Sequence, residues 1–384
     1  MKTEALKHLE HLESVIYMAG EAGANYVASL IDSFPRILGK SAVFEKVDGA
    51  PSLTCGYVDG KFFVSTKSLF AKTPKYSTSE EEIEQNHGNA PGLVVKLKEG
   101  LKYLPAVVPD NGMVWQGDFM FGEGDKRVHQ FDDGVHILFR PNTITYAVPT
   151  DSPLGKEIER AKIGIVSHTS YIGQIGDLKI DLSPDVSILR KSADVWTFNN
   201  RLPSTSTLEF TSEDINLFKQ ASQAVLSVKG IAESVSDNTQ LVGLINVFYN
   251  SKVRVGDSLS DANDVVEELK GFIKAWAEKE AGKVAQEKTK QAKIAVGDKL
   301  VQFIEDNDQP FEALTRAVAI TVQAKEVMID KLDKIAQLKQ FYETDSGFEV
   351  ANPEGFVAVS DDGVVKLVHR LEFSRANLLN TKFK

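Results

Sequence analysis

Apolar residues recur every three or four positions near the start of the chain. Leu6, Leu9 and Leu12 follow this spacing, and it continues from Ala22 to Leu30. A period of about 3.6 residues is the signature of an amphipathic helix. The pattern therefore predicts helices over residues 3–38.

The pattern changes to that of β-strands between residues 42 and 70. The segments AVFEK, SLTCGYV and KFFVSTK are rich in β-branched and aromatic residues, and Asp59-Gly60 between the last two is a strong hairpin signal. Residues 78–104 return to a helical pattern, with Thr78 or Ser79 as the N-cap before a run of glutamates that suits the helix dipole.

Further strand-like segments follow, and a short helix is expected to begin near Pro153. The segments are MVWQGDFMF (113–121), VHILF (135–139), TITYAVP (143–149) and KIGIVSH (162–168). After a mixed region, the chain is almost wholly helical from Thr211 to Tyr342, and two strands joined at residues 361–363 return near the end.

Two β-rich blocks thus flank a long helical segment. Surface insertions are tolerated and the ends of a chain tend to return to one core, so we expect a helical domain inserted into an α+β domain. The predicted core spans residues 1–175 and 346–384, with the N-terminal helices included, and the predicted insertion spans residues 176–345.

Composition narrows the class of protein. Apolar residues make up 42% of the chain and charged residues 26%, which is typical of a soluble globular protein, and no apolar run is long enough to cross a bilayer. Cys55 is the one cysteine, so no internal disulfide is expected and a reducing cytoplasm is the expected compartment. The net charge of −10 argues against coating nucleic acid through overall charge, although a local basic groove could still bind it.

The segment FEKVDGAPS, residues 44–52, carries the first candidate chemistry. A neutral amine at Lys46 could attack a phosphate, Asp48 could contact a nucleotide sugar, and Gly49 would let the backbone approach a ligand closely. Taken alone, the four residues K-V-D-G are better explained as a hairpin turn with a solvated lysine.

With Glu45 before the lysine, the segment resembles motif I of the covalent nucleotidyltransferases. This superfamily comprises ATP-dependent DNA ligases, RNA ligases and mRNA capping enzymes. The resemblance implies that Lys46 is the nucleophile, that Glu45 recognises adenine, and that ATP is the substrate. STKS, residues 65–68, resembles motif Ia, with Lys67 where the family usually has arginine.

Four later segments follow in the order of the family. VWQGDFMF resembles motif III with Asp118 in place of glutamate, and TITYAVP resembles motif IIIa, whose aromatic residue, here Tyr146, stacks on the base. PEGFV matches motif IV at Glu354, and VVKLVHR resembles motif V at Lys366. The resemblance implies an α+β ligase-type core of antiparallel sheets around a nucleotide.

The implied roles are chemically reasonable. Asp118 and Glu354 would hold Mg²⁺, a cation that prefers carboxylate, water and phosphate oxygens. Lys67 and Lys366 would neutralise charge on the α-phosphate as pyrophosphate leaves. Motif V usually has a second lysine two residues on, where this chain has valine, and Arg370 could substitute for it.

Three functions follow from these patterns. The first is an ATP-dependent RNA ligase-like enzyme that seals nucleic-acid ends through a lysyl-AMP intermediate, because only fourteen residues follow Arg370 and leave no room for the C-terminal OB-fold of DNA ligases and capping enzymes. The second is a catalytically degenerate fold that serves nucleotide binding or protein assembly, suggested by the departures in motifs Ia, III and V. The third is a coincidental series of motifs. RNA is the favoured acceptor over DNA, no membrane partner is expected, and the oligomeric state stays open.

Overall fold

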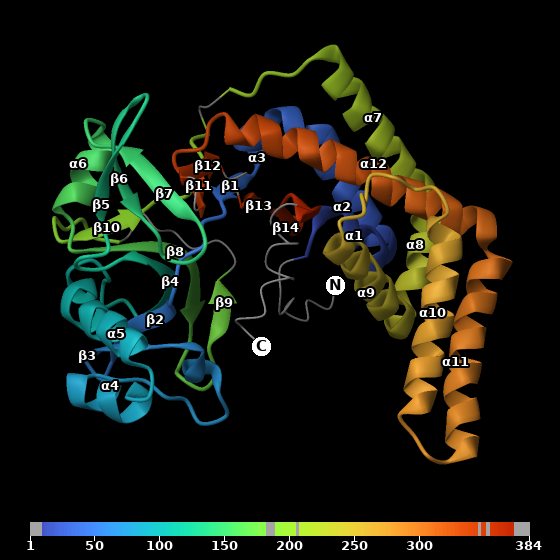
Figure 1. Ribbon diagram of the computed structural model, residues 1–384, viewed down its shortest axis with the longest axis horizontal. Helices are drawn as coiled ribbons and strands as arrows, with labels where there is room; N and C mark the ends of the chain where they lie inside the picture. The colour runs from blue at the N-terminus through green and yellow to red at the C-terminus, as the bar shows by residue number, and fades with distance from the viewer. Residues whose placement is uncertain (1–9, 182–188, 205–206, 345–346, 351–353, 372–384) are drawn as a thin grey trace. The chain divides into compact units, whose positions relative to one another are not determined.

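The computed structural model describes residues 10–181, 189–204, 207–344, 347–350 and 354–371 (Figure 1). Its elements divide into two compact units, each described below by itself. Unit 1 comprises Met1–Phe44, Leu202–Ile335 and Glu354–Lys384, and unit 2 comprises Glu45–Arg201 and Ala336–Pro353. The α+β class and the antiparallel sheets expected from the sequence are confirmed.

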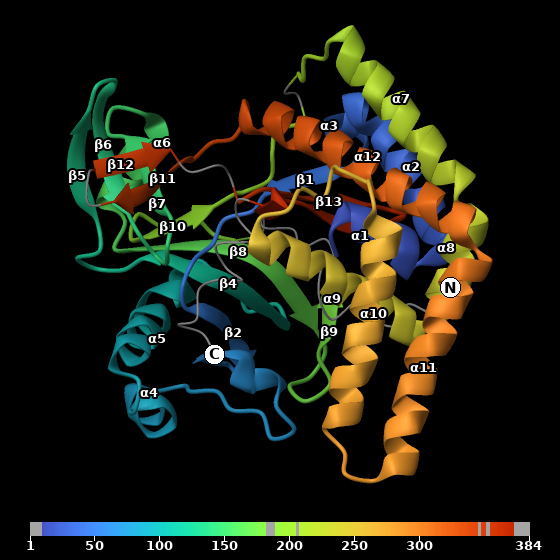
Figure 2. The same cartoon turned by 45° about the vertical axis from the view of Figure 1, so that its right-hand side comes forward.

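Unit 1 is mainly helical. Its helices are α1 (Leu12–Met18), α2 (Gly20–Ser33), α3 (Ile37–Lys40), α7 (Ser212–Ser227), α8 (Lys229–Ser236), α9 (Thr239–Val255), α10 (Val265–Gly282), α11 (Glu287–Asp306) and α12 (Asp308–Asp333), with the 3₁₀ turn η1 (Phe34–Arg36). Helix α7 begins with a capping box in which Thr211 accepts from the Asp214 N–H and the Asp214 carboxylate accepts from the Thr211 N–H. Helices α10 and α11 lie side by side as a hairpin (Figures 1 and 2).

A three-stranded sheet accompanies these helices, in the order β1-β13-β14. Its strands are β1 (Ala42–Glu45), β13 (Phe356–Ser360) and β14 (Gly363–Leu367). The pair β13–β14 is antiparallel, with Phe356 opposite Leu367, and its turn confirms the predicted hairpin at residues 361–363. Strand β1 ends at Glu45, the first residue of unit 2.

Unit 2 contains two larger sheets. The six-stranded sheet has the order β10-β8-β4-β2-β3, with β9 also paired to β8, and the five-stranded sheet has the order β12-β11-β7-β6-β5. The first comprises β2 (Ser52–Val58), β3 (Lys61–Ser65), β4 (Met113–Phe121), β8 (Ile163–Ile172), β9 (Lys179–Asp181) and β10 (Val195–Phe198); the second comprises β5 (Arg127–Phe131), β6 (Gly134–Phe139), β7 (Thr145–Pro149), β11 (Lys339–Thr344) and β12 (Gly347–Val350).

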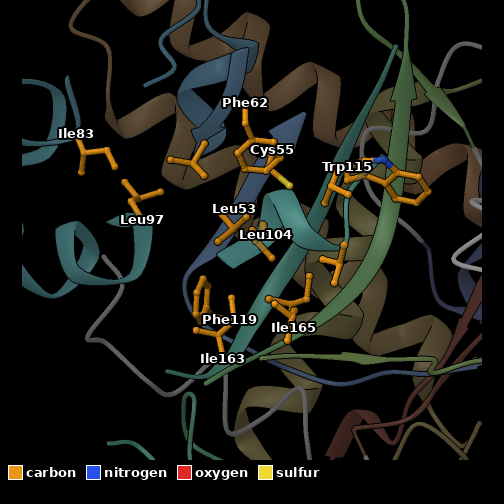
Figure 3. Close-up of a cluster of buried hydrophobic side chains, with 14 of the residues drawn as sticks. Leu53, Cys55, Phe62, Ile83, Leu97, Leu104, Trp115, Phe119, Ile163 and Ile165 are labelled. Carbon is orange, nitrogen blue, oxygen red and sulfur yellow. The ribbon is translucent and has the colours of Figure 1, made fainter. Parts of the chain in front are cut away.

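Helices cover one face of the six-stranded sheet. They are α4 (Glu80–His87) and α5 (Pro91–Tyr103), with the 3₁₀ turns η2 (Lys67–Phe70) and η3 (Leu104–Ala106); helix α6 (Pro153–Arg160) packs on β6 and β7. Figure 3 shows the core beneath α4 and α5, where Ile83 and Leu97 meet Leu53, Phe62 and Cys55. Cys55 is buried, and burial raises the pKa of its thiol to about 12, so it behaves as a small apolar residue.

Local signals placed several of these elements correctly. Asp59 and Gly60 adopt φ angles of 50° and 73° between the antiparallel strands β2 and β3, and Ser79 caps α4 by accepting from the Glu82 N–H. The single helix expected over residues 78–104 is two helices, since the second begins at Pro91.

The compact units group the chain differently from the expected domains. The N-terminal helices α1 and α2 pack against α7, α8 and α12 of unit 1 rather than with the strands of unit 2. The last strands of the chain, β13 and β14, also belong to unit 1, whereas β11 and β12 belong to unit 2. The grouping depends on which elements bury their apolar faces against one another. Helical periodicity identifies an apolar face but not the partner that the face packs against.

Candidate functional site

The loop after β1 is held in place by β4 and β7 of unit 2. The backbone N–H of Asp48 donates to the Tyr146 hydroxyl at 2.9 Å, and the Asp48 carboxylate accepts from Asn142 Nδ2 at 2.7 Å. The N–H of Ala50 donates to the Phe119 carbonyl at 2.9 Å. Two segments far apart in the sequence, β4 and residues 142–146, therefore position the residues on either side of Gly49.

Gly49 brings this loop into close contact with β4. A Cβ atom at Gly49 would lie 2.6 Å from Asp118 Cβ and 2.6 Å from the Phe119 carbonyl oxygen, which is too close for any side chain. The β2–β4 register also places Ser52 opposite Asp118. The glycine of motif I is thus required by a backbone approach to the residue that motif III singles out.

Electrostatics connect the same residues. Burial raises the pKa of the Asp48 carboxyl above its ordinary range, and Asp118 raises it further, while Lys46 and the Asn142 hydrogen bond act in the opposite direction. Lys46 is half-buried at the start of this loop. An amine and two carboxylates are therefore within electrostatic reach of one another in unit 2.

These donors fit part of a magnesium shell. Asp48 and Asp118 repel each other, and a divalent cation would relieve that repulsion while taking further oxygens from water or phosphate. Among the described residues, no group of three or more His, Cys, Asp and Glu side chains is arranged to hold a metal ion. Any Mg²⁺ here would therefore depend on oxygens that a substrate and water supply.

Glu45 is almost fully buried at the end of β1. Its Oε1 accepts from the Gln337 backbone N–H at 2.9 Å, and its backbone exchanges hydrogen bonds with Asn200, at 2.7 Å to the Asn200 carbonyl and 2.9 Å from Nδ2. The carboxylate thus joins the motif I strand to the segment that enters β11. The resemblance assigns the Glu45 carboxylate to adenine recognition, but one of its two oxygens already accepts the Gln337 hydrogen bond.

Tyr146 differs from its expected role. Its ring is fully buried and stacks on Phe139, with ring centroids 5.6 Å apart, and its hydroxyl accepts from Asp48. No ring face is exposed for a base in this structure. The register places Tyr146 opposite Phe139 on one face of the five-stranded sheet, where its hydroxyl supports the Asp48 loop.

Lys67 is exposed in η2, directly after β3. The last residue of β3, Ser65, is opposite Thr54, and β2 then runs back to Ser52, which is opposite Asp118. Lys67 therefore follows β3 at the end of the sheet where Asp118 lies.

The remaining predicted residues belong to unit 1. Glu354 is fully buried just before β13, and half-buried Lys366 on β14 donates its backbone N–H to the Glu10 carbonyl at 2.9 Å. Strand β1 ends just before Lys46, β13 begins just after Glu354, and β14 carries Lys366. These three strands form one sheet. Motifs I, IV and V therefore share a hydrogen-bonded strand arrangement.

Arg370 also has a different environment from the expected one. Its Nη1 lies 3.3 Å from Glu13 Oε1, and its Nη2 donates to Asn250 Oδ1 at 2.6 Å, both in the interior of unit 1. The Glu13 carboxylate also pairs with Lys325, at 2.7 Å. The Arg370 guanidinium, which we expected to substitute for the second lysine of motif V, is thus engaged in a buried group of ion pairs.

Asn142 is a site residue that the sequence did not reveal. It lies in the short R-P-N-T connection before β7, where its amide reaches the Asp48 carboxylate. Its position just before the motif IIIa segment was the one available signal. Glu13 and Lys325 gave no signal, because charges on helices usually face solvent.

A separate cavity of about 620 Å³ lies in unit 2, between α6, β10 and the segment before β10. Gln337, the backbone partner of Glu45, borders it. Neither Lys46 nor Asp118 does, so the cavity is not the candidate site itself. Its other lining residues are Leu154, Glu157, Arg160, Leu189, Lys191, Ser192, Ala193, Val195, Trp196, Thr197, Phe198 and Asn199.

No helix in the part of the chain that the structure describes is long and apolar enough to cross a membrane. Searches of the curated proteins and of the solved structures find no match to the chain. Residues 6–382 match a protein family of unknown function, DUF6267, and because the match covers nearly the whole chain, the protein belongs to that family.

Proposed function

We propose that this protein is an ATP-dependent nucleotidyltransferase of the RNA ligase type, with Lys46 as the nucleophile. The observation that supports the proposal most is the packing of the motif I loop on β4, where Gly49 touches Asp118 and Asp48 lies within reach of Lys46 and Asp118. These residues come from two motifs that are about seventy positions apart in the sequence. A hairpin turn with a solvated lysine does not require such an arrangement.

The proposed reaction begins at the Lys46 amine. Its nitrogen attacks the α-phosphorus of ATP, a P–N bond forms, the bond to pyrophosphate breaks, and the amine loses its proton. The AMP group then passes to a 5′-phosphate end, and a 3′-hydroxyl displaces AMP as the strand is sealed. Mg²⁺ would supply charge neutralisation at the phosphates, with Asp118 of unit 2 as a proposed ligand.

Three residues of unit 2 have proposed roles beside the nucleophile. Within unit 2, Asp48, fixed by Asn142, is placed to contact the ribose, while Lys67 would neutralise phosphate charge. Tyr146 supports the loop rather than stacking on a base, because its ring is buried.

Adenylylation tests the proposal directly. The protein is incubated with α-labelled ATP and Mg²⁺, and covalently bound label on the protein is measured after denaturing electrophoresis. We expect label on the wild type, none on Lys46→Ala, and a loss of at least tenfold on Asp118→Ala. Lys61→Ala, an exposed lysine at the start of β3, is the matched control and should label normally. Equal labelling of Lys46→Ala would refute the proposal.

One observation favours a second function, a degenerate fold that binds nucleotide without catalysis. Arg370, the residue that could replace the missing lysine of motif V, is held in a buried ion group. This function predicts that ATP binds, as measured by calorimetry, but leaves no covalent adduct under any Mg²⁺ concentration. Formation of lysyl-AMP on the wild type would exclude it.

A further inference from the structure

The cavity of about 620 Å³ between α6 and β10 has no role in the proposed reaction. Figure 1 shows these two elements, and all the residues that line the cavity belong to unit 2. Ligand pockets in proteins commonly measure about 300–1,000 Å³. The cavity is therefore large enough to hold a small molecule of its own.

Part of the cavity lining is apolar and aromatic. Trp196 and Phe198 of β10 are buried, and their rings stack with centroids 5.2 Å apart. Leu154 and Leu189 also border the cavity and are half-buried, so an apolar ligand would cover them further. This part of the lining favours a ligand with a ring or another apolar body.

Strand β10 leaves one edge open beside the cavity. The Ile163 N–H donates to the Asp194 carbonyl at 3.1 Å, and in a parallel pair alternate residues direct their backbone groups to the same neighbour. The N–H and C=O of Thr197 are therefore directed away from β8, the partner of β10 among the described strands. The lining includes residues of β10 and none of β8, so these two backbone groups are on the side of the cavity. They can form hydrogen bonds with a polar group of a ligand.

Two cationic side chains line the cavity without an ion pair. Arg160, the last residue of α6, and Lys191 are both exposed, and neither pairs with an acidic side chain in the part of the chain that the structure describes. Arg160 Nε donates to the Lys156 carbonyl at 3.0 Å, which leaves the two terminal nitrogens of the guanidinium available. Glu157 is the one acidic residue of the lining, so the charged residues around the cavity are positive in sum.

The negative end of the α6 dipole does not oppose an anion here. A helix C-terminus ordinarily repels negative charge, because its last carbonyls have no partner within the helix. Lys126 Nζ donates to three carbonyls at this end of α6, including those of Ile158 and Ala161 at 2.7 Å. An anionic group beside Arg160 would therefore approach a helix end whose carbonyls are already satisfied.

We propose that this cavity binds a small molecule that combines an apolar ring with a phosphate or carboxylate group. Arg160 and Lys191 would hold the anionic group, since a guanidinium can donate two parallel hydrogen bonds to either kind of anion. The ring would lie against the apolar part of the lining, and the Thr197 backbone would bond a polar substituent. Both parts of the ligand are needed, because exposed cations alone attract an anion only weakly in water.

Hydrogen bonds connect this cavity to Glu45. Gln337, which borders the cavity, donates its backbone N–H to the Glu45 carboxylate at 2.9 Å and its Nε2 to the Asn199 carbonyl at 3.2 Å. The next residue, Asn200, exchanges two hydrogen bonds with the Glu45 backbone. A ligand that displaces Gln337 or Asn199 would therefore shift groups that position Glu45. We expect the bound ligand to change the affinity for ATP, a consequence that rests on the proposed function, whereas binding itself does not.

Tryptophan fluorescence tests the proposal, because Trp196 borders the cavity. Phenyl phosphate and phenylacetate are the probes, and inorganic phosphate and benzyl alcohol each lack one of the two parts. We expect one of the two probes to bind with a Kd on the order of 1 mM, and the tighter one identifies the anion. Each molecule that lacks a part should bind roughly tenfold more weakly.

Two variants of α6 complete the binding test. Arg160→Gln should weaken binding of the tighter probe about tenfold, because it removes the charge from the hydrogen-bond donor. Lys156→Gln is the matched control, since Lys156 is an exposed cation on the same helix and its side chain does not line the cavity. It should bind the probe as the wild type does.

The outcomes separate this proposal from the proposed function. Equal binding by the wild type and Arg160→Gln, or no saturable change with either probe, would overturn it. Loss of binding in Lys46→Ala would also overturn it, because the probe would then occupy the candidate site. Absence of adenylylation with intact, Arg160-dependent binding removes only the ligase function.

The connection to Glu45 has its own measurement. With the probe at saturation, the ATP concentration that gives half-maximal labelling should shift roughly fivefold in the wild type and stay unchanged in Arg160→Gln. A shift of the same size in both proteins would show that the probe competes with ATP, and it would refute the connection.

Discussion

Replacing Glu13 should destabilise unit 1 strongly, because this carboxylate is shared by two buried cations. Glu13 Oε2 lies 2.7 Å from Lys325 Nζ, Oε1 lies 3.3 Å from Arg370 Nη1, and all three side chains are buried. Glu13→Gln leaves two cations without their anion. Removing one partner of a buried ion pair typically costs about 3–5 kcal/mol, so we expect a loss of that size.

The pKa of Glu13 indicates a free-energy contribution of similar size. Burial alone would raise it, but Lys325, His11 and Arg370 together lower it from 4.5 to about 2. A difference of about 2.5 units corresponds to about 3 kcal/mol. Because the folded-state pKa is depressed, this stabilisation is fully present above pH 4.5 and is lost as the pH falls towards 2.

Urea unfolding followed by far-UV circular dichroism measures both effects. At pH 7 the free energy of unfolding of Glu13→Gln should be lower than that of the wild type by about 3 kcal/mol, and this difference should shrink below pH 4.5. Lys325→Met should cost less, since Glu13 keeps Arg370 and burial already lowers the pKa of Lys325. The matched control, Glu312→Gln, breaks an exposed ion pair with Arg316 on α12, the helix that also carries Lys325.

The control should change the free energy of unfolding by no more than about 0.5 kcal/mol. A Glu13→Gln loss no larger than that of the control, or a difference that grows on acidification, would show that the buried ion group contributes little. It would also show that the attraction of Lys325 and Arg370 does not lower the pKa of the Glu13 carboxyl.

Three further predictions follow from close contacts. Gly49→Ala should abolish adenylylation, because the added Cβ would lie 2.6 Å from Asp118 Cβ; retention of label would contradict the packing. Lys126→Met should lower the free energy of unfolding by about 2 kcal/mol in urea melts, because its ammonium donates to three carbonyls at the end of α6. Gly297→Ala should lower the melting temperature because its Cβ would meet a side chain of α10 at 2.5 Å, whereas Gly271→Ala has open space and should raise it.

Elements and turns were predictable where the signal is local. The Asp59-Gly60 hairpin, the Ser79 cap and the helices from Thr211 onward depend on backbone preferences and periodicity that a short window contains. The edge strands β5 and β10 were not predicted, and the helical prediction to Tyr342 is wrong at its end, because residues 339–342 belong to strand β11. Strand β5 has four exposed residues in succession, so it lacks apolar alternation, and its strand conformation depends on pairing with β6.

The candidate site was predictable in part, for a related reason. The order of motifs pointed to Lys46, Asp48, Gly49 and Asp118, and the structure brings these four together in unit 2. The stacking of Tyr146 on Phe139 could not be predicted, because β7 is buried on both faces and its sequence does not specify which ring each side chain meets. The engagement of Arg370 depends on Glu13, which lies more than 350 positions away.

The sequence by itself determined the α+β class, most helices and strands, and the residues that carry the proposed chemistry, since these depend on short-range patterns and residue types. Only the tertiary structure decided which helices pack together and which charged side chains are buried. Those outcomes depend on the burial of apolar faces between segments far apart in the chain, and a local pattern does not specify the partner.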